Sequence, residues 1–335
     1  MEIVFFHRND AMGYSIRKGF APLIEGLRNK HEVKEYMLPF YGSNPIKLAK
    51  NIIFIYKHRS KIGINHITGE VHYGVIGLMG VPSIVTIHDD YAIRLAKRGF
   101  LDKLYKWLFW LYLPVKLADE VICISEQTLH NINRYINNSN IIVLPHHVLP
   151  SNMVYTPKKF KEEPFNLLQI GTNENKNVET TIRALKGLNY KLTIVQKMTD
   201  AQTKLANKLA INYENVYNLT DDEIVEQYKK ADVVLFPSSY EGLGMIILES
   251  QAVGRPVITT NKEPMLWVAG KGGALFINDP KNEIELRSAI LEIFKNENLQ
   301  NELIAKGQEN IKRFTLEAVL DRYEKLYRKI LKHND

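Results

Sequence analysis

With 335 residues, of which 45% are hydrophobic and 24% charged, the chain has the composition of a globular protein and a length that favours two domains. Its single cysteine, Cys123, excludes an intramolecular disulfide, and no segment approaches the roughly 20 apolar residues that cross a bilayer. The net charge of +7 is uneven, because residues 1–150 carry +6. This excess favours an anionic partner, such as a nucleotide diphosphate, a nucleic acid or an acidic lipid.

The first half of the chain alternates short apolar runs with longer amphipathic stretches. Such alternation predicts a parallel β-sheet with helices on both faces. The predicted strands are residues 3–6, 33–37, 64–67, 83–87, 120–124 and 140–144, and the predicted helices are 14–27, 46–58, 95–117 and 126–137. Cys123 lies in one of these strands, so a buried thiol is expected rather than a reactive one.

A stretch rich in proline and charge, residues 151–164, predicts a linker, and the α/β pattern then begins again. The second set of predicted strands is 165–170, 191–195, 233–236, 256–259 and 274–277, and the second set of helices is 178–185, 201–210, 221–230, 244–253, 283–294 and 316–331. The pattern therefore predicts two doubly wound, Rossmann-like domains, 1–150 and 165–315. We expect the last segment, 316–335, to form a helix that packs back on the first domain.

The most informative segment follows the predicted strand 233–236. Gly242 and Gly244 precede an apolar helix, where glycines let backbone N–H groups approach a phosphate. Glu249 lies within that helix, and a carboxylate in apolar surroundings requires hydrogen-bond donors, which sugar hydroxyls provide. The alternative is that Glu241 is a solvated loop residue and Glu249 a charge on the helix surface.

The spacing of Glu241 and Glu249 also bears on hydrolysis. Eight residues of helix rise about 12 Å, whereas the paired carboxylates of glycoside hydrolases lie about 5–9.5 Å apart. The spacing favours two points along one elongated ligand.

Two glutamates separated by seven residues, set in Ser-x-Tyr-Glu-Gly-Leu-Gly over 238–244 and followed by Ala-Val-Gly-Arg-Pro-Val-Ile over 252–258, closely resemble the family 4 retaining glycosyltransferases of the GT-B fold. The resemblance covers nearly the whole chain. Further segments that resemble the family are 86–89, 121–126, 170–177 and 314–317. The implied fold is two Rossmann-like domains facing each other across a cleft, the first binding the acceptor and the second the nucleotide sugar.

The resemblance implies a role for each matching residue. Glu249 would hold the donor ribose, Glu241 the hydroxyls of the transferred sugar and Lys176 the diphosphate. His88 would contact the donor sugar near the reacting carbon, which makes Glu241, His88 and Lys176 the expected catalytic set. The other donor-binding residues that the resemblance implies are Gly13, Gly171, Thr172, Gly242, Leu243, Gly244 and Met245.

The chain departs from the family pattern at three places. Thr172 stands where the family usually has arginine, Gly13 is a single glycine where two are usual, and His146-His147 replace part of an Asn-Gly-Val turn. The adjacent histidines suggest a metal site, but neighbouring side chains of an extended segment point to opposite faces, so we expect no bound metal and no cofactor. A purely structural role for His88 also stays open.

The segment 100–117 combines aromatic residues with lysines. It suits a buried domain helix with a polar edge, and it also suits a helix on an anionic membrane surface.

The sequence thus predicts transfer of a sugar from a UDP- or GDP-sugar to a saccharide or lipid-linked hydroxyl acceptor, with retention, in cell-envelope polysaccharide or glycolipid synthesis. A sugar-nucleotide epimerase and an inactive sugar-nucleotide-binding scaffold are the alternatives. The Gly-x-Gly-x-x-Gly of a dehydrogenase is missing after residues 3–6, and no nucleic-acid-binding motif occurs. Residues 1–6 lack an export signal, so a cytoplasmic location is expected, soluble or peripheral on the inner membrane face.

Overall fold

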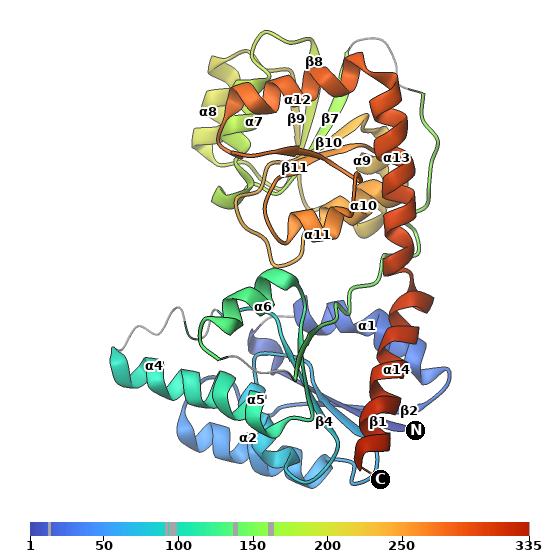
Figure 1. Ribbon diagram of the computed structural model, residues 1–335. Coiled ribbons are helices and arrows are strands. Elements are labelled where there is room, and N and C mark those ends of the chain that lie inside the picture. Colours follow the sequence, from blue (N-terminus) through green and yellow to red (C-terminus); the bar gives the residue numbers. More distant parts are fainter. Residues whose placement is uncertain (13–14, 91–92, 94–98, 137–139, 160–163, 335) are drawn as a thin grey trace. The chain divides into compact units, whose positions relative to one another are not determined.

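The computed structural model describes residues 1–12, 15–90, 93, 99–136, 140–159 and 164–334 (Figure 1). The chain divides into two compact units. Unit 1 consists of Met1–Val148 and Phe314–Asp335, and unit 2 of Leu149–Arg313.

Unit 1 is built on a six-stranded parallel sheet whose strand order is β2-β1-β3-β4-β5-β6. The strands are β1 (Glu2–His7), β2 (Glu32–Met37), β3 (Ile64–Ile67), β4 (Ser83–Ile87), β5 (Glu120–Cys123) and β6 (Ile141–Val143). Alternate side chains of each strand enter different cores. Ile3 and Phe5 pack with helices α1 (Ser15–Arg28) and α14 (Leu316–Asn334), whereas Val4 and Phe6 pack on the opposite face.

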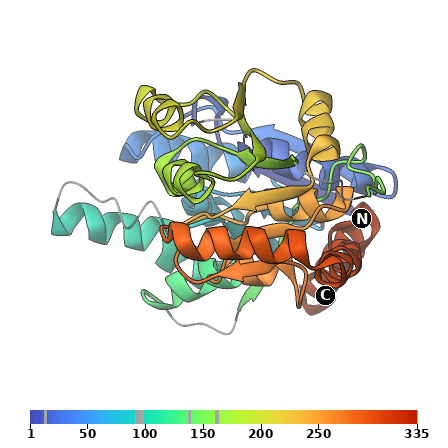
Figure 2. The same cartoon turned by 90° about the horizontal axis from the view of Figure 1, so that it is seen from above.

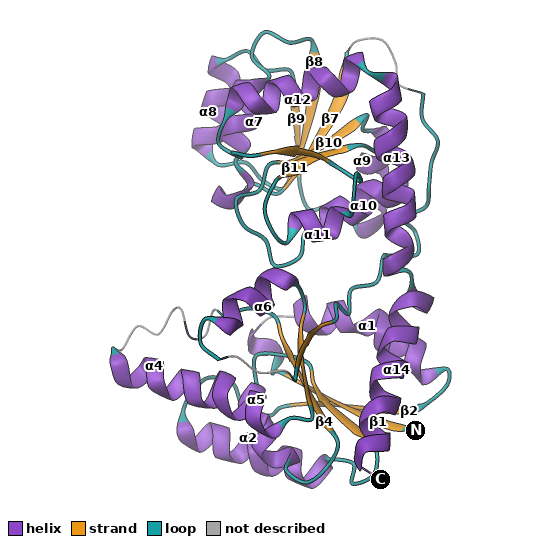
Figure 3. Ribbon diagram, viewed as in Figure 1, coloured by secondary structure: helices purple, strands orange, loops and turns teal. Residues whose placement is uncertain are grey.

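Helices cover both faces of this sheet (Figure 3). They are α1 (Ser15–Arg28), α2 (Pro45–His58), α4 (Phe100–Trp107), α5 (Leu113–Leu117), α6 (Glu126–Asn133) and α14 (Leu316–Asn334), with short helical turns η1 (Asp10–Met12) and η2 (His72–Leu78). The last helix, α14, packs on α1, and the Tyr323 hydroxyl donates to the Leu144 carbonyl at 3.1 Å. Cys123 is fully buried, as expected, and burial raises the pKa of its thiol to about 12.

The predicted helix 95–117 is interrupted. Residues 94–98 lie outside the described part, and a π-helical segment, η3 (Leu108–Tyr112), separates α4 from α5. Pro114 has no N–H to donate to the carbonyl of Trp110 four residues earlier. That carbonyl instead accepts a hydrogen bond from His72 Nδ1 at 2.9 Å, and the Leu113 N–H reaches back to Leu108.

Unit 2 has a second six-stranded parallel sheet, ordered β12-β11-β10-β7-β8-β9. Its strands are β7 (Phe165–Ile170), β8 (Tyr190–Val195), β9 (Tyr213–Val216), β10 (Val233–Phe236), β11 (Val257–Thr260) and β12 (Leu275–Ile277). Its helical elements are η4 (Glu174–Lys176), α7 (Val178–Ala184), α8 (Asp200–Lys208), α9 (Asp221–Lys230), α10 (Met245–Val253), α11 (Met265–Ala269), α12 (Glu283–Lys295), α13 (Glu297–Ile311) and η5 (Lys312–Phe314). Helices α9 and α12 lie on opposite sides of this sheet (Figure 2). Two doubly wound α/β sheets confirm the predicted fold class.

Two helices and one strand of unit 2 were absent from the sequence-based prediction: α11, α13 and β9. The predicted helix 126–137 also ends earlier, because α6 stops at Asn133. Helix α13 shows no apolar periodicity, since its buried side consists of Gln300, Leu303, Gly307 and Asn310.

The segment that follows residue 148 is held against unit 2 by a buried arginine. The guanidinium of Arg255 is 3% exposed and donates to the carbonyls of Thr156, Tyr228 and Lys229 at 2.8, 3.1 and 3.0 Å. The Thr156 N–H in turn donates to the Val253 carbonyl at 3.2 Å. In this way one side chain joins the proline-rich segment to α9 and α10.

Candidate functional site

The main candidate site lies at the carboxyl edge of the unit 2 sheet, between β7 and β10. The chain moves outward from β7 through β8 to β9 and then crosses back to β10, so β7 and β10 are neighbours at a topological switch point. Ligands of open α/β sheets bind in the crevice at such points. The loop after β7 and the loop after β10 carry most of the residues that the sequence singled out.

Polar side chains join these two loops. Asn177 Nδ2 donates to the Pro237 carbonyl at 2.7 Å, and Asn175 Nδ2 donates to the Tyr240 carbonyl at 2.8 Å. The Ser239 N–H donates to the Asn175 carbonyl at 2.8 Å. The hydrogen bonds hold the two loops in one arrangement and therefore fix the side chains that project from them.

Lys176 and Glu241 form an ion pair across the two loops. Lys176 Nζ lies 2.5 Å from Glu241 Oε1 and 4.6 Å from the ring centroid of Phe236. The two side chains are only 15% and 14% exposed, and the Ser238 hydroxyl also donates to Glu241. The sequence placed both residues at one site but did not anticipate that they would bind each other.

The loop after β7 allows the Lys176 side chain to cross it. Gly171 has a φ of +99°, and a Cβ at this position would lie 3.0 Å from Lys176 Cγ and Cε. Glycine is therefore required both by the backbone and by the packing. The hydroxyl of Thr172 is turned away toward the Lys197 carbonyl, to which it donates at 2.9 Å.

Helix α10 begins beside the ion pair. Gly244 is its N-cap residue and Met245 its first helical residue. The first N–H groups of a helix have no intrahelical acceptor, so they bind anions together with the positive end of the helix dipole. Gly242 is exposed, whereas Leu243 and Gly244 are buried.

Glu249 lies one turn further along α10 and is partly buried. The Tyr228 hydroxyl of α9 donates to Glu249 Oε2 at 2.6 Å. Burial, together with the neighbouring carboxylate, raises the pKa of Tyr228 well above its ordinary value, so this phenol stays protonated as a donor. The expectation that a ligand must supply the hydrogen-bond donors of Glu249 is thus corrected, because a tyrosine of the same unit supplies one.

In unit 1, His88 lies just beyond the carboxyl end of β4 and is held by a backbone hydrogen bond. Its Nε2 donates to the Thr68 carbonyl at 2.7 Å, and Thr68 follows β3. Burial lowers the pKa of His88 to about 4, so the ring is neutral at neutral pH. Gly13, which the sequence placed in this unit's first loop, lies outside the described residues.

Two further histidines of unit 1, His146 and His147, lie close to His88. The rings of His88 and His146 have centroids 5.3 Å apart, and the rings of His146 and His147 are 4.2 Å apart. His146 also stacks on Phe20 at 3.8 Å. Burial lowers the pKa of His147 to about 3 and that of His146 well below its ordinary value. Within the described residues, no three His, Cys, Asp or Glu side chains are grouped so that they could hold a metal ion.

Comparison with known proteins places this geometry in a family. A family model described as Glycosyl transferases group 1 matches residues 155–310, and one described as Glycosyltransferase Family 4 matches residues 7–151. The two matches adjoin and together span nearly the whole chain. The chain belongs to the family 4 glycosyltransferases. The family resemblance of the Glu241–Glu249 segment is therefore confirmed.

Individual relatives of this glycosyltransferase are distant. An uncharacterised glycosyltransferase of Methanocaldococcus jannaschii is 23% identical over 91% of this chain and 85% of its own. An Escherichia coli enzyme named UDP-Gal:alpha-D-GlcNAc-diphosphoundecaprenol alpha-1,3-galactosyltransferase is 27% identical over 73% of this chain and 70% of its own.

Solved glycosyltransferases share the fold. A glycosyltransferase from Rickettsia africae superimposes with a TM-score of 0.80 at 17% identity, covering 99% of this chain and 98% of that one. The Anabaena protein HepE in complex with UDP gives a TM-score of 0.76 at 13% identity over 97% and 99% of the two chains. The fold of this glycosyltransferase is accordingly GT-B.

Sequence reasoning missed the residues that hold the site residues in place. Tyr228, Asn175 and Ser238 lie in three different segments of unit 2 and contact Glu249 or Glu241 only in the folded chain.

Proposed function

We propose that this glycosyltransferase transfers a sugar from a UDP- or GDP-sugar to a hydroxyl acceptor with retention of configuration, in the synthesis of a cell-envelope polysaccharide or glycolipid. The observation that carries the proposal is the Lys176–Glu241 pair beside the N-terminus of α10, at the switch point of the unit 2 sheet. The names of relatives support the substrate class. The E. coli relative is named for UDP-galactose, and a Salmonella typhimurium relative is named an O-antigen chain mannosyltransferase.

In this proposal the donor lies along the carboxyl edge of unit 2. Glu249 accepts hydrogen bonds from the ribose hydroxyls, and the Tyr228 hydrogen bond orients its carboxylate. Lys176 and the N–H groups of Leu243, Gly244 and Met245 bind the diphosphate. Gly171 and Thr172 shape the phosphate loop, and Glu241 contacts the hydroxyls of the transferred sugar.

The reaction breaks the bond between the anomeric carbon and the diphosphate oxygen and forms a bond from that carbon to the acceptor oxygen. The family's same-face displacement gives the acceptor proton to the leaving phosphate oxygen. The protein then contributes positioning and charge stabilisation. Lys176 stabilises the charge that develops on the leaving diphosphate. The family resemblance also assigns His88 and Gly13 to donor binding.

Replacing Glu249 by alanine is expected to weaken donor binding by about 1.5–3 kcal/mol, the value of a hydrogen bond to a charged group. Tyr228→Phe should have a smaller effect, because it removes only the donor that orients the carboxylate. Titration calorimetry with the nucleotide sugar measures both changes. Glu226→Ala, on the exposed side of α9, is the matched control, and unchanged affinity in Glu249→Ala would refute the ribose assignment.

Activity is expected to survive chelation with EDTA. Lys176 and the amides of α10 supply positive charge at the proposed diphosphate site, so a divalent cation is not needed there. Initial rates before and after EDTA treatment measure this. Loss of activity in EDTA that Mg²⁺ or Mn²⁺ restores would show that the protein groups are insufficient.

Two measurements test the proposal as a whole. Thermal unfolding in a panel of UDP- and GDP-sugars identifies the donor, because a ligand at 100 times its Kd stabilises the protein by about 2.7 kcal/mol. Proton NMR of the product then reports the anomeric configuration, and inversion would refute retention.

Thr172 in place of the family arginine favours an inactive scaffold as the second candidate. A transferase slowly hydrolyses its donor without acceptor, whereas a scaffold that binds the donor releases no nucleotide.

A further inference from the structure

The positive charge of unit 1 is concentrated in one segment. Residues 36–69 contain five lysines and arginines and no aspartate or glutamate, which accounts for +5 of the +6 carried by residues 1–150. Helix α2 forms the centre of this segment. The charge excess is therefore a local feature of one helix and its flanks.

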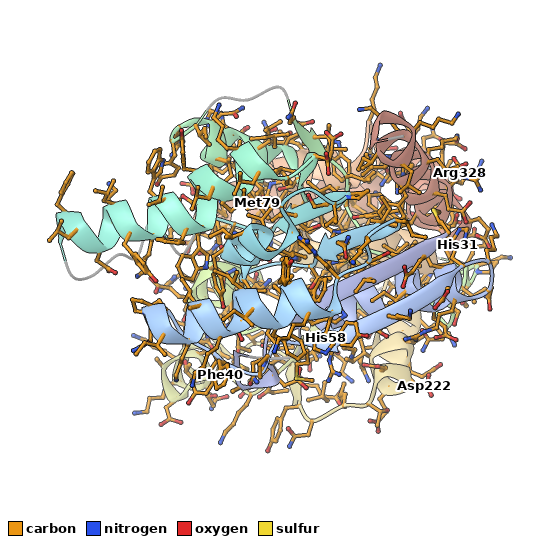
Figure 4. All side chains as sticks on the ribbon, turned by 90° about the horizontal axis from the view of Figure 1, so that it is seen from below. His31, Phe40, His58, Met79, Asp222 and Arg328 are labelled. Carbon is orange, nitrogen blue, oxygen red and sulfur yellow. The ribbon has the colours of Figure 1, made fainter. Side chains whose placement is uncertain are left out.

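The outer face of α2 is apolar as well as basic. Leu48, Asn51 and Ile55 are buried, whereas Ile46 is 68% exposed and Ile53 53% exposed. Further exposed apolar side chains in and beside this segment are Met37, Tyr41, Tyr56, Ile62 and Met79. Figure 4 shows α2 along the near side, with its last residue, His58, labelled. We call this set of side chains the α2 face.

Basic groups of the α2 face lie over its aromatic rings. Lys47 Nζ is 4.7 Å from the ring centroid of Tyr41, and Lys50 Nζ is 5.2 Å from that of Phe40. Long basic side chains that lie along apolar surface can keep their charged ends in water or among lipid headgroups.

The start of α4 adjoins the α2 face. Tyr105 Oη donates to the Ser43 carbonyl at 3.0 Å, directly before α2. Phe100, Leu101 and Leu104 are exposed, at 78%, 76% and 45%. The two helices lie side by side in Figures 1 and 4.

The rest of the segment 100–117 is mostly half-buried and packs against the unit 1 core, with Leu111 and Val115 fully buried. Trp107 and Trp110 pack against the unit 1 core, and Trp110 Nε1 donates to the Glu70 carbonyl at 2.6 Å. Lys106 pairs with Asp102 at 3.3 Å. The most exposed apolar side chains of this segment are therefore those at its start.

We propose that the α2 face and the start of α4 bind the surface of an anionic phospholipid bilayer. A helix face with aliphatic and aromatic side chains, flanked only by cations, has the composition of an interfacial helix. A nucleic-acid surface needs the cations but not exposed Ile46 and Ile53. The absence of any acidic residue in 36–69 matches a partner of uniformly negative charge.

The position of α2 in the sheet determines which acceptors docking would favour. Tyr41 and Ile46 follow the carboxyl end of β2, so they lie at the same edge of the parallel sheet as His88 after β4. Docking brings that edge next to the bilayer and selects an acceptor whose lipid portion stays in the membrane. Only this acceptor assignment rests on the proposed function; membrane binding does not.

Co-sedimentation with liposomes tests the proposal. The protein should bind vesicles containing phosphatidylglycerol at low salt, bind less as salt increases, and ignore vesicles of phosphatidylcholine alone. Lys50→Gln with Lys57→Gln should lower the partition coefficient about 30-fold, as expected for two cations near an anionic surface. Ile46→Gln with Ile53→Gln should lower it roughly tenfold.

Matched controls come from exposed residues of unit 2. Ile284→Gln replaces a 73% exposed isoleucine of α12, and Lys204→Gln with Lys208→Gln replaces two exposed lysines of α8. These variants should bind vesicles like the parent, and the α2 variants should keep the parent's thermal unfolding and nucleotide affinity.

Three results would each overturn the proposal: no binding to acidic vesicles, an equal loss of binding in the control variants, or a dimerisation that Ile46→Gln with Ile53→Gln abolishes. Vesicle binding that persists while donor binding fails would overturn only the proposed function.

Discussion

Lys176→Ala is expected to lower kcat by about 10²–10³, the loss typical of removing one preorganised group that stabilises developing negative charge. Lys176 Nζ is held between Glu241 and the Phe236 ring at the carboxyl edge of the sheet, so its charge is already in position before the donor arrives. Affinity for nucleoside diphosphate should fall with kcat. Steady-state kinetics and calorimetry with UDP and GDP measure the two effects.

The ion pair complicates this experiment, because removing Lys176 also leaves Glu241 without its cation. The double variant Lys176→Ala, Glu241→Gln separates the two roles. If Lys176 acts only by neutralising Glu241, the double variant recovers diphosphate affinity; if Lys176 binds the diphosphate, affinity stays weak. Lys191→Ala is the control, since Lys191 pairs with Glu214 at 2.8 Å on the same sheet but outside the two loops. Diphosphate binding that is insensitive to Lys176→Ala and to salt would refute the assignment.

Unit 1 is expected to lose stability between pH 6.5 and 5, while unit 2 does not. Burial lowers the pKa of His66 and His147 to about 3 and that of His88 to about 4, and it also lowers the pKa of His146 well below its ordinary value. The unfolded chain binds protons at these histidines below about pH 6.5, but the folded unit does not. The contribution of these neutral histidines to the stability of unit 1 is thus fully present above that pH and is lost as the pH falls. For His66, His88 and His147 the loss is about 2 kcal/mol each at pH 5.

Unit 2 serves as an internal control, because residues 149–332 contain no histidine. Hydrogen exchange of the intact protein at pH 7.5 and 5, corrected for intrinsic exchange rates, should show loss of protection confined to unit 1. The solvent-exposed His130→Gln should leave the pH dependence unchanged, whereas His146→Gln should remove about one proton from it. Equal loss of protection in both units would contradict the histidine explanation.

Most strands and helices could be predicted from the sequence, because local residue composition determines where they form. Short apolar runs that alternate with amphipathic stretches predicted eleven of the twelve strands, and the strand–glycine loop–helix pattern at 233–250 predicted the main candidate site. Strand β9 was not predicted, because its residues are mostly half-exposed at a sheet edge and do not form an apolar run. Helix α13 was not predicted, because its buried side contains Gly307 and Asn310 and therefore shows no apolar periodicity. Gly307 packs on Gln251, where a Cβ would lie 2.9 Å from Gln251 Cγ, and Asn310 donates to the Gln251 side chain at 2.8 Å.

The amino-acid sequence by itself determined the fold class, the family and the set of residues at the carboxyl edge of unit 2, because each depends on spacing along one strand, loop or helix. Only the tertiary structure decided which of those residues bind each other. Lys176 meets Glu241, and Glu249 meets Tyr228, because strand order brings β7 beside β10 and packing sets α9 against α10. The same holds for the surface of unit 1. Composition left segment 100–117 open between a buried helix and a membrane contact. Packing half-buries its aromatic side chains from Tyr105 onward, whereas Ile46 and Ile53 of the α2 face are exposed.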